Sequence, residues 1–253
     1  HRSIDLERLE FFMKQGSAKL CLLTANFRNP LGYCLSHQQK QKIAQLAQQY
    51  QCFILEDDIY GECSFHKERP LPIRYWDQQG YVIWCGSVSK SLSSAYRVGW
   101  FCLGQQLQHL RPQLLANNIG VNTPLQLGLA DFIYSRGYRE HLEGLRPKLM
   151  QQVEQYRAYI LEVFNGIPIA LSQSQGGYAL WMQLPENMTG LALYYLAHSQ
   201  GINIVPGEVF GEDLRYQHFI RLNAGHALTP EIRQAIQQLA DWVRESYLSQ
   251  SRL

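Results

Sequence analysis

Residues 81–90, Tyr-Val-Ile-Trp-Cys-Gly-Ser-Val-Ser-Lys, begin as an apolar run and end in two serines and a lysine. Short apolar runs that end in polar residues are typical of buried parallel strands, whose ends open into loops. Residues 19–25 (Lys-Leu-Cys-Leu-Leu-Thr-Ala) and 53–58 (Phe-Ile-Leu-Glu-Asp-Asp) have the same form. We therefore expect three strands of a mostly parallel sheet with helices on both faces.

The segments around these strands predict an α/β fold for the first half of the chain. Ser36 and Gln39 form a capping-box pattern, and apolar residues follow at helical spacing up to Tyr50. Residues 98–103 follow the third run closely enough to predict an antiparallel strand. Residues 105–165 have few helix breakers, so we expect helices there, the last a long one through 151–164.

The second half has a different pattern and predicts a smaller α/β domain. Strands are expected at 167–172, 177–184, 202–205 and 218–222, with a helix at 190–200. Thr229 and Pro230 suit the first positions of a closing helix. We therefore predict that residues 1–149 form part of a large domain and that residues 150–253 form a small domain after a connecting helix.

Composition and charge narrow the class of protein. The 253 residues are 46% hydrophobic and 17% charged, which is ordinary for a globular protein. A net charge of +2 gives no argument for a nucleic-acid or membrane partner. No apolar run approaches the roughly 20 residues of a membrane span, and no signal peptide is evident. The chain begins with His1 followed at once by a helix-like stretch, which suggests a fragment or a processed form.

The cysteines favour a cytoplasmic protein. Several of the six lie in apolar, strand-like runs, and none forms a C-x-x-C pair. We therefore expect free thiols of a reducing compartment, with neither disulfides nor a metal site.

Lys90 has the properties of an amine that can react with an aldehyde. It ends a run that starts apolar, and partial burial makes a lysine usable for a Schiff base. Ser87, Ser89 and Arg97 are donors that suit a phosphate. An aldehyde together with a phosphate suggests pyridoxal-5'-phosphate (PLP). Taken alone, a serine-rich loop with a lysine and an arginine is more often a solvated turn.

Polar residues also end the other two predicted strands. Asp57 can pair with the pyridine nitrogen of PLP, and Tyr60 can donate to the 3'-oxygen of the ring. Asn29, in the turn Asn29-Pro30-Leu31-Gly32, can reach the same oxygen. The simpler alternatives are acids that cap the next helix and a plain turn. Because all three sites end successive strands, where open α/β sheets bind ligands, we expect them to converge.

Over essentially its whole length the chain resembles fold-type I PLP enzymes, the aspartate-aminotransferase superfamily. The motifs that carry the resemblance are Asn29-Pro30-x-Gly32, Asp57-x-x-Tyr60, Ser87-x-Ser89-Lys90, Arg97-x-Gly99, Gly176-Gly177-Tyr178-x-x-Trp181, Val205-Pro206-Gly207-x-x-Phe210 and Arg221-Leu222-Asn223. The resemblance implies that Lys90 is the Schiff-base lysine and that Asp57 partners the ring nitrogen. It also assigns Asn29 and Tyr60 to the 3'-oxygen, and Ser87, Ser89 and Arg97 to the phosphate. Arg221 would bind a substrate carboxylate, although a surface salt bridge is the simpler alternative.

Three further stretches are Glu56-Asp57-Asp58-Ile59-Tyr60-Gly61-Glu62, Tyr96-Arg97-Val98-Gly99-Trp100 and the stretch from Gly137 to Arg146. In these stretches the chain resembles the MocR subfamily of GntR-type bacterial regulators. Those proteins join an N-terminal winged helix-turn-helix to an aminotransferase-like domain that senses PLP or an amine. Ser93-Ser94-Ala95 stands where the subfamily usually has Ala-Pro-Gly, so we expect an altered loop backbone there. We expect His141 and Arg146 on a solvated helix face.

The resemblance also implies what else a complete site requires. In the family, residues that precede this segment supply an aromatic ring against the cofactor, part of the phosphate cup and further strands, and a homodimer partner completes the site. We therefore predict an effector domain of a regulator that senses an amino acid or amine and contacts DNA only through an N-terminal domain outside this chain. The alternatives are a free-standing aminotransferase acting on an amino acid and a 2-oxo acid, and a PLP-free scaffold.

Overall fold

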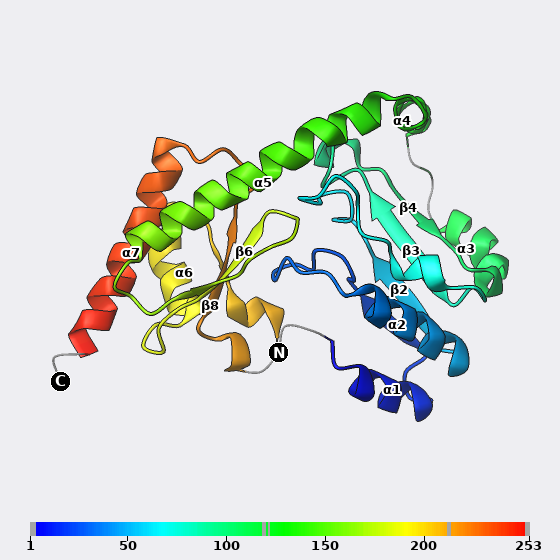
Figure 1. Ribbon diagram of the computed structural model, residues 1–253, viewed down its shortest axis with the longest axis horizontal. Helices are drawn as coiled ribbons and strands as arrows, with labels where there is room; N and C mark the ends of the chain where they lie inside the picture. The colour runs from blue at the N-terminus through cyan, green and yellow to red at the C-terminus, as the bar shows by residue number, and fades with distance from the viewer. Residues whose placement is uncertain (1–3, 118–119, 121, 212–213, 251–253) are drawn as a thin grey trace. The chain divides into compact units, whose positions relative to one another are not determined.

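The computed structural model describes residues 4–117, 120, 122–211 and 214–250, and the chain divides into two compact units (Figure 1). The first unit comprises His1–Arg28 and Tyr33–Pro147, and the second comprises Asn29–Gly32 and Lys148–Leu253. The short turn that contains Asn29 therefore belongs to the second unit, although both flanking segments belong to the first. Each unit is described by itself below.

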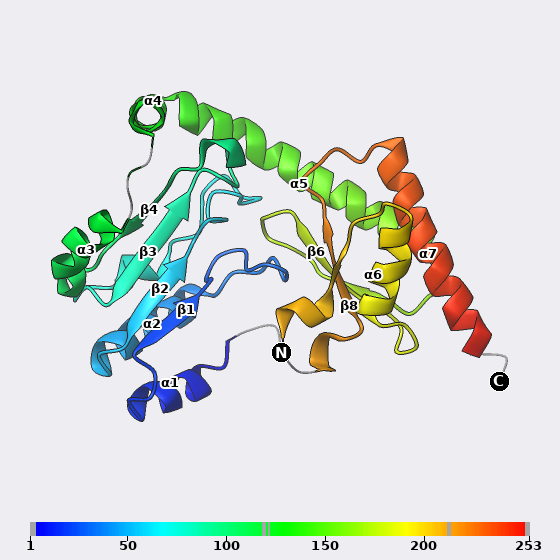
Figure 2. The same ribbon diagram turned by 180° about the vertical axis from the view of Figure 1, so that it is seen from behind.

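The sheet of the first unit has four strands in the order β1-β2-β3-β4, which Figure 2 shows side by side. They are β1 (Leu20–Leu23), β2 (Phe53–Asp57), β3 (Val82–Ser87) and β4 (Gly99–Cys102). The first three strands are parallel, and β4 is antiparallel to β3, with Gly99 opposite Ser87. The expected mostly parallel sheet and its antiparallel strand are both confirmed.

Helices α1 (Leu6–Lys14) and α2 (His37–Gln49) pack on one face of this sheet. The capping box predicted for α2 is present, because Ser36 accepts from the Gln39 backbone and the Gln39 side chain accepts from the Ser36 backbone. Ile43, Leu46 and Ile54 are fully buried in the shared core. On the opposite face, the Leu22 side chain is 68% exposed, so α1 and α2 cover one of the two faces.

The segment after β4 is helical, as expected. It contains η3 (Gln105–Leu110), α3 (Arg111–Ala116), α4 (Thr123–Tyr134) and α5 (Gly137–Val163). Two short 3₁₀ turns lie earlier in the chain: η1 (Ile73–Trp76) precedes β3, and η2 (Ser94–Tyr96) precedes β4. The α5 helix contributes its first turns to the first unit and the rest to the second. In the loop that departs from the subfamily pattern, Ser93 accepts from the backbone of Ala95, and Arg97 is left-handed with φ 53°.

The second unit is a small antiparallel sheet with helices against it (Figure 2). Its strands, in the order β5-β6-β8-β7, are β5 (Ala170–Leu171), β6 (Ala179–Gln183), β7 (Val205–Pro206) and β8 (Phe219–Asn223). Two short turns, η4 (Gly207–Phe210) and η5 (Leu214–Tyr216), join β7 to β8, and the helices are α6 (Gly190–Ser199) and α7 (Pro230–Gln250).

Helix α7 begins where the sequence predicts. Thr229 Oγ1 accepts from the backbone of Ile232 at 3.4 Å, which is the expected cap. Ile236, Leu239 and Val243 on its apolar stripe are buried. Met182 and Ile220, on the facing strands, are fully buried as well.

Candidate functional site

The residues predicted to hold the cofactor ring follow the ends of two neighbouring strands in the first unit. Asp57 is the last residue of β2, and Tyr60 and Lys90 each lie three residues beyond a strand. The Lys90 Nζ lies 5.6 Å from the centre of the Tyr60 ring, so the two loops meet. Among the described residues, the Lys90 amine has neither a hydrogen bond nor an ion pair. It is half-buried and available for a covalent bond.

The two adjacent carboxylates Asp57 and Asp58 have different surroundings. Side chains alternate along a strand, and Asp58 is 4% exposed, with its oxygens bonded to Asn26, Trp84 and Arg69. Asp57 is half-buried, and Oδ1 accepts from the Ile59 backbone at 3.2 Å. Its Oδ2 has no partner within the described part of the chain. Asp57 is therefore the carboxylate that can accept another group.

The predicted phosphate donors lie at and beyond the end of β3. The hydroxyl oxygens of Ser87 and Ser89 are 2.8 Å apart, and the Ser89 backbone donates to Ser87 Oγ at 3.1 Å. Arg97 is exposed, and its NH1 makes one long bond of 3.5 Å to the carbonyl of Ser94. Most of the guanidinium donors therefore have no partner in the part of the chain that is described.

In the second unit, Arg221 and Asn29 lie together. Arg221 NH1 donates to Asn29 Oδ1 at 3.3 Å, and its guanidinium carbon lies 5.8 Å from the centre of the Phe210 ring. Within the described ranges Arg221 has no carboxylate partner, so the surface salt bridge considered above is not formed. A half-buried arginine without a counter-ion suits a bidentate carboxylate.

The prediction that His141 and Arg146 lie on a solvated helix face is wrong. The Arg146 side chain is 11% exposed and donates to Glu62 at both the backbone oxygen (3.1 Å) and Oε2 (2.8 Å). The Nε2 atom of His141 lies 2.6 Å from the carbonyl oxygen of Ser91. The spacing of Tyr138, His141 and Leu142 could have indicated this, because it is the spacing of an inward-facing helix stripe.

Burial sets the protonation of two groups near the site. It raises the pKa of the Cys63 thiol to about 12, so this group is a neutral thiol beside Lys90, whose carbonyl it contacts at 3.4 Å. Burial also raises the pKa of Glu56, which directly precedes Asp57, to about 7. The Cys63 thiol therefore does not compete with Lys90 as a nucleophile, because the reactive form of a thiol is the thiolate.

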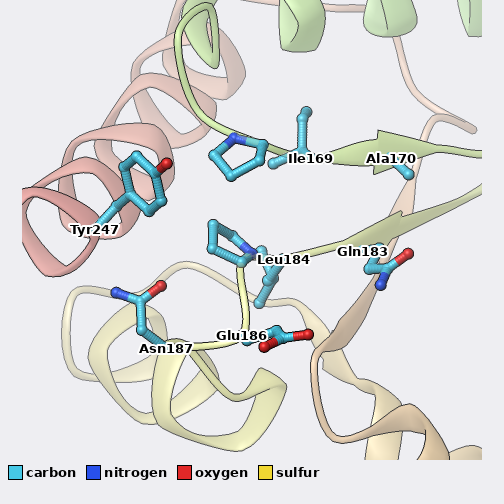
Figure 3. A pocket seen from close by; sticks show the side chains of 9 residues that line it. Ile169, Ala170, Gln183, Leu184, Glu186, Asn187 and Tyr247 are labelled. Atoms are coloured by element: carbon cyan, nitrogen blue, oxygen red, sulfur yellow. The ribbon is translucent and has the colours of Figure 1, made fainter. Parts of the chain in front are cut away.

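A separate pocket in the second unit contains none of the predicted site residues. It has a volume of about 620 Å³ and is lined by residues 168–170 and 183–187 and by Tyr247. Figure 3 shows Tyr247 and Asn187 at one end and Ala170 and Gln183 at the other. We assign no ligand to it.

The described residues also bear on three further features: a metal site, disulfides and a membrane-spanning helix. These residues contain no group of three or more side chains arranged to hold a metal ion. All six cysteines are free, and Cys102 is exposed. No helix of the described part is both long and apolar enough to cross a membrane.

The arrangement fits PLP by the chemistry of its donors. Among the described residues, the Lys90 amine has no hydrogen bond or ion pair, Asp57 has an open oxygen, and the Ser87 and Ser89 hydroxyls adjoin one another, all at or just beyond the carboxyl ends of two parallel strands. The exposed Arg97 guanidinium lies on the loop that follows the second of these strands. These features define a fold-type I α/β protein whose cofactor is PLP. The sequence matches the family described as aminotransferase class I and II over residues 1–239. The chain belongs to this family.

Individual relatives fall into two groups. The chain is 32% identical to a protein from Escherichia coli K12 named an uncharacterized HTH-type transcriptional regulator, YdcR, over 96% of this chain and 52% of that protein. Its structure is similar to the crystal structure of a multiple substrate aminotransferase from Thermococcus profundus, with a TM-score of 0.80 and 27% sequence identity. The match covers 96% of this chain and 61% of that one.

A third comparison supports the fold alone. The structure of LysN, an α-aminoadipate aminotransferase from Thermus thermophilus complexed with N-(5'-phosphopyridoxyl)-L-leucine, has a TM-score of 0.85 at 23% identity. The match covers 98% of this chain and 64% of LysN. The chain spans about half the length of the curated regulators that it matches.

Proposed function

We propose that this chain is the PLP-binding, aminotransferase-like effector domain of a GntR/MocR-type transcriptional regulator. It would sense an amino acid or amine, while a winged helix-turn-helix elsewhere in the protein contacts DNA. The observation that carries the proposal is the Lys90 amine, which has no polar partner among the described residues and lies over the Tyr60 ring. Similarity to several proteins named as HTH-type regulators supports the regulatory part of the proposal.

Each predicted residue has a role in this proposal. Lys90 anchors the cofactor covalently, and Asp57 holds a proton on the ring nitrogen. By the family resemblance, Tyr60 of the first unit and Asn29 of the second would each donate to the ring oxygen, while Ser87, Ser89 and Arg97 would hold the phosphate. When bound, PLP supplies an electron sink next to the reacting amine. Arg221 orients a ligand by its carboxylate, and Phe210 shields one side of that guanidinium.

A catalytic aminotransferase is the second candidate function. The similarity to aminotransferases favours it, because the same lysine can both anchor PLP and move a proton. The same fold and the same lysine serve both sensing and catalysis, so turnover distinguishes the two functions. Rapid turnover of an amino acid and a 2-oxo acid by the full-length protein would favour the enzyme. A ligand-dependent change in DNA affinity without such turnover would favour the regulator.

The test of the anchor is direct. The full-length protein is loaded with PLP, reduced with borohydride, digested and analysed by mass spectrometry. We expect the cofactor mass on the peptide that contains Lys90, and we expect both that mass and the visible absorbance to be lost in Lys90→Ala. Lys67→Ala is the matched control, because Lys67 is an exposed lysine of the same unit. Retention of PLP on Lys90→Ala would refute the proposed anchor.

We extend the proposal to assembly, domain boundary and location. A homodimer is supported by the exposed apolar side chains of the first unit, such as Leu22 and Phe101. We place the domain boundary between residues 149 and 150, close to the division after Pro147. A cytoplasmic location is supported by six free thiols. Sedimentation of the full-length protein tests the dimer.

A further inference from the structure

The turn that carries Lys90 is held from outside by side chains of two other segments. Ser91 is 3% exposed, and its hydroxyl lies 2.8 Å from the Tyr138 hydroxyl on α5. Its carbonyl oxygen lies 2.6 Å from Nε2 of His141 on the same helix. On the other side, the Cys63 thiol donates to the carbonyl of Lys90 at 3.4 Å. The backbone carbonyls of Lys90 and Ser91 are therefore both contacted by side chains from other segments.

The turn itself is closed by its own backbone. The amides of Leu92 and Ser93 both donate to the carbonyl of Val88, at 2.8 and 3.1 Å. Val88 is fully buried, so the base of the turn is anchored in the core. The carbonyls of Lys90 and Ser91 remain outside this internal bonding, and they are the two groups that Cys63 and His141 contact.

Contacts along α5 set the orientation of the His141 ring toward the turn of residues 88–93. The rings of Tyr138 and His141 are stacked, with centroids 6.4 Å apart and planes at 17°. Leu142 is 7% exposed on the same face, and Arg146 ties the next turn of the helix to Glu62. A carbonyl oxygen only accepts hydrogen bonds, so Nε2 of His141 carries the proton and donates. The His141 imidazole therefore donates a hydrogen bond to the Ser91 carbonyl from a ring whose orientation is set by its neighbours.

We propose that His141, oriented by Tyr138, is a positioning residue that holds the Ser91 carbonyl and so keeps the Lys90 amine over the Tyr60 ring. The inference rests on the proposed role of Lys90 as the anchor, and it assigns a task to residues that do not touch the cofactor. We call the His141–Ser91 hydrogen bond the clamp. Its loss frees the turn and gives water more access to the bond between Lys90 and the cofactor; hydrolysis of that bond by water would return the free amine and release PLP as the aldehyde, so PLP would be lost faster.

The experiment compares variants of the full-length protein by two independent readouts. Hydrogen exchange of a peptide covering residues 87–93 is measured without cofactor, and the rate of PLP loss is measured by visible absorbance. His141→Ala removes the donor, Tyr138→Phe removes only the hydroxyl, and His141→Gln restores an N–H donor. The matched control is His198→Ala, because His198 and Tyr194 of α6 form a similar stack at 5.5 Å and 15°.

We expect exchange in residues 87–93 and PLP loss to rise about tenfold in His141→Ala, the change that follows from losing one well-formed hydrogen bond. Tyr138→Phe should show a smaller rise, His141→Gln should approach wild type, and His198→Ala should match it. If His141→Ala does not fold, Tyr138→Phe and His141→Gln decide the question by the same readouts.

The two hypotheses fail separately. If PLP binds Lys90 while His141→Ala and Tyr138→Phe behave like His198→Ala, the positioning role is wrong and the proposed function stands. If wild type does not bind PLP, the proposed function fails, and exchange in the cofactor-free protein still reports on the clamp. Unchanged exchange in that case overturns the clamp as well.

Discussion

Asn26 donates a hydrogen bond from Nδ2 to Oδ1 of Asp58 across 2.8 Å, although both side chains are buried. The oxygen of the same amide accepts from Nζ of Lys40 at 2.6 Å, and Lys40 is fully buried too. Asp58 also pairs with Arg69. Burying a polar or charged group without a partner is costly. These bonds supply partners for Lys40 and for Asp58, the residue that follows Asp57, and so offset the cost of burying their charges.

The first prediction concerns the charge of Asp58. Asp58→Asn should lower the free energy of unfolding by about 2–4 kcal/mol, because it removes the buried charge that pairs with Arg69 and accepts from Asn26 and Trp84, and leaves Arg69 with Glu62 as its remaining counter-ion. Urea unfolding of the full-length protein measures the loss. The control is Asp241→Asn, whose pair with Arg244 has side chains 43% and 36% exposed, and which should cost less than about 1 kcal/mol. Equal losses in both variants would contradict the prediction.

The second prediction concerns the pH dependence of stability. Burial raises the pKa of Glu56 from 4.5 to about 7, although the backbone amides of Ile73 and Arg74 donate to it. The folded protein therefore binds more protons than the unfolded chain between these pH values. The contribution of protonated Glu56 to the free energy of unfolding is therefore present in full below pH 4.5 and is lost as pH rises through about 7. The free energy of unfolding should fall by at most about 3 kcal/mol across this range.

Glu56→Gln should remove this dependence, because the amide does not titrate. The free energy of unfolding is measured at several pH values for wild type, for Glu56→Gln and for Glu162→Gln, an exposed carboxylate on α5. We expect the free energy of unfolding of wild type, minus that of Glu56→Gln, to fall as pH rises from 4.5 to about 7. The curve of Glu162→Gln against pH should follow wild type. A constant difference for Glu56→Gln would show that Glu56 does not titrate in this range.

The local features of the fold could be predicted from the sequence because their causes are local. The apolar run that ends in Ser87 predicts a buried strand, and the Ser36 and Gln39 pair predicts the start of α2. The convergence of Lys90 and Tyr60 also follows, since parallel strands present their carboxyl ends at one edge. Strand alternation could also have separated Asp57 from Asp58.

The long-range polar contacts could not be predicted in the same way. A lysine in a helix is normally exposed, so the burial of Lys40 depends on Asn26 and on the Leu71 carbonyl, 31 residues away in sequence. Arg146 faces Glu62 across 84 residues, and His141 faces Ser91 across 50. Helical spacing gives the face on which these residues lie, but a polar residue on an inward face has no evident partner in the sequence.

The third prediction concerns Gly207 in the Val205-Pro206-Gly207 motif. A methyl group at this position would clash with the backbone oxygens of Tyr216 and Phe219, and Phe219 begins the strand that carries Arg221. Gly207→Ala should therefore destabilise the protein by about 1–3 kcal/mol, as overpacking does, and weaken binding of a carboxylate ligand. Gly144→Ala is the opposite control: apart from its chain neighbours and the adjacent backbone of its own helix, no described atom lies within 4 Å of the added methyl group, and alanine in a helix should stabilise by about 0.5–1 kcal/mol. Urea unfolding measures both, and a Gly207→Ala variant as stable as wild type would mean that the β8 backbone yields without cost.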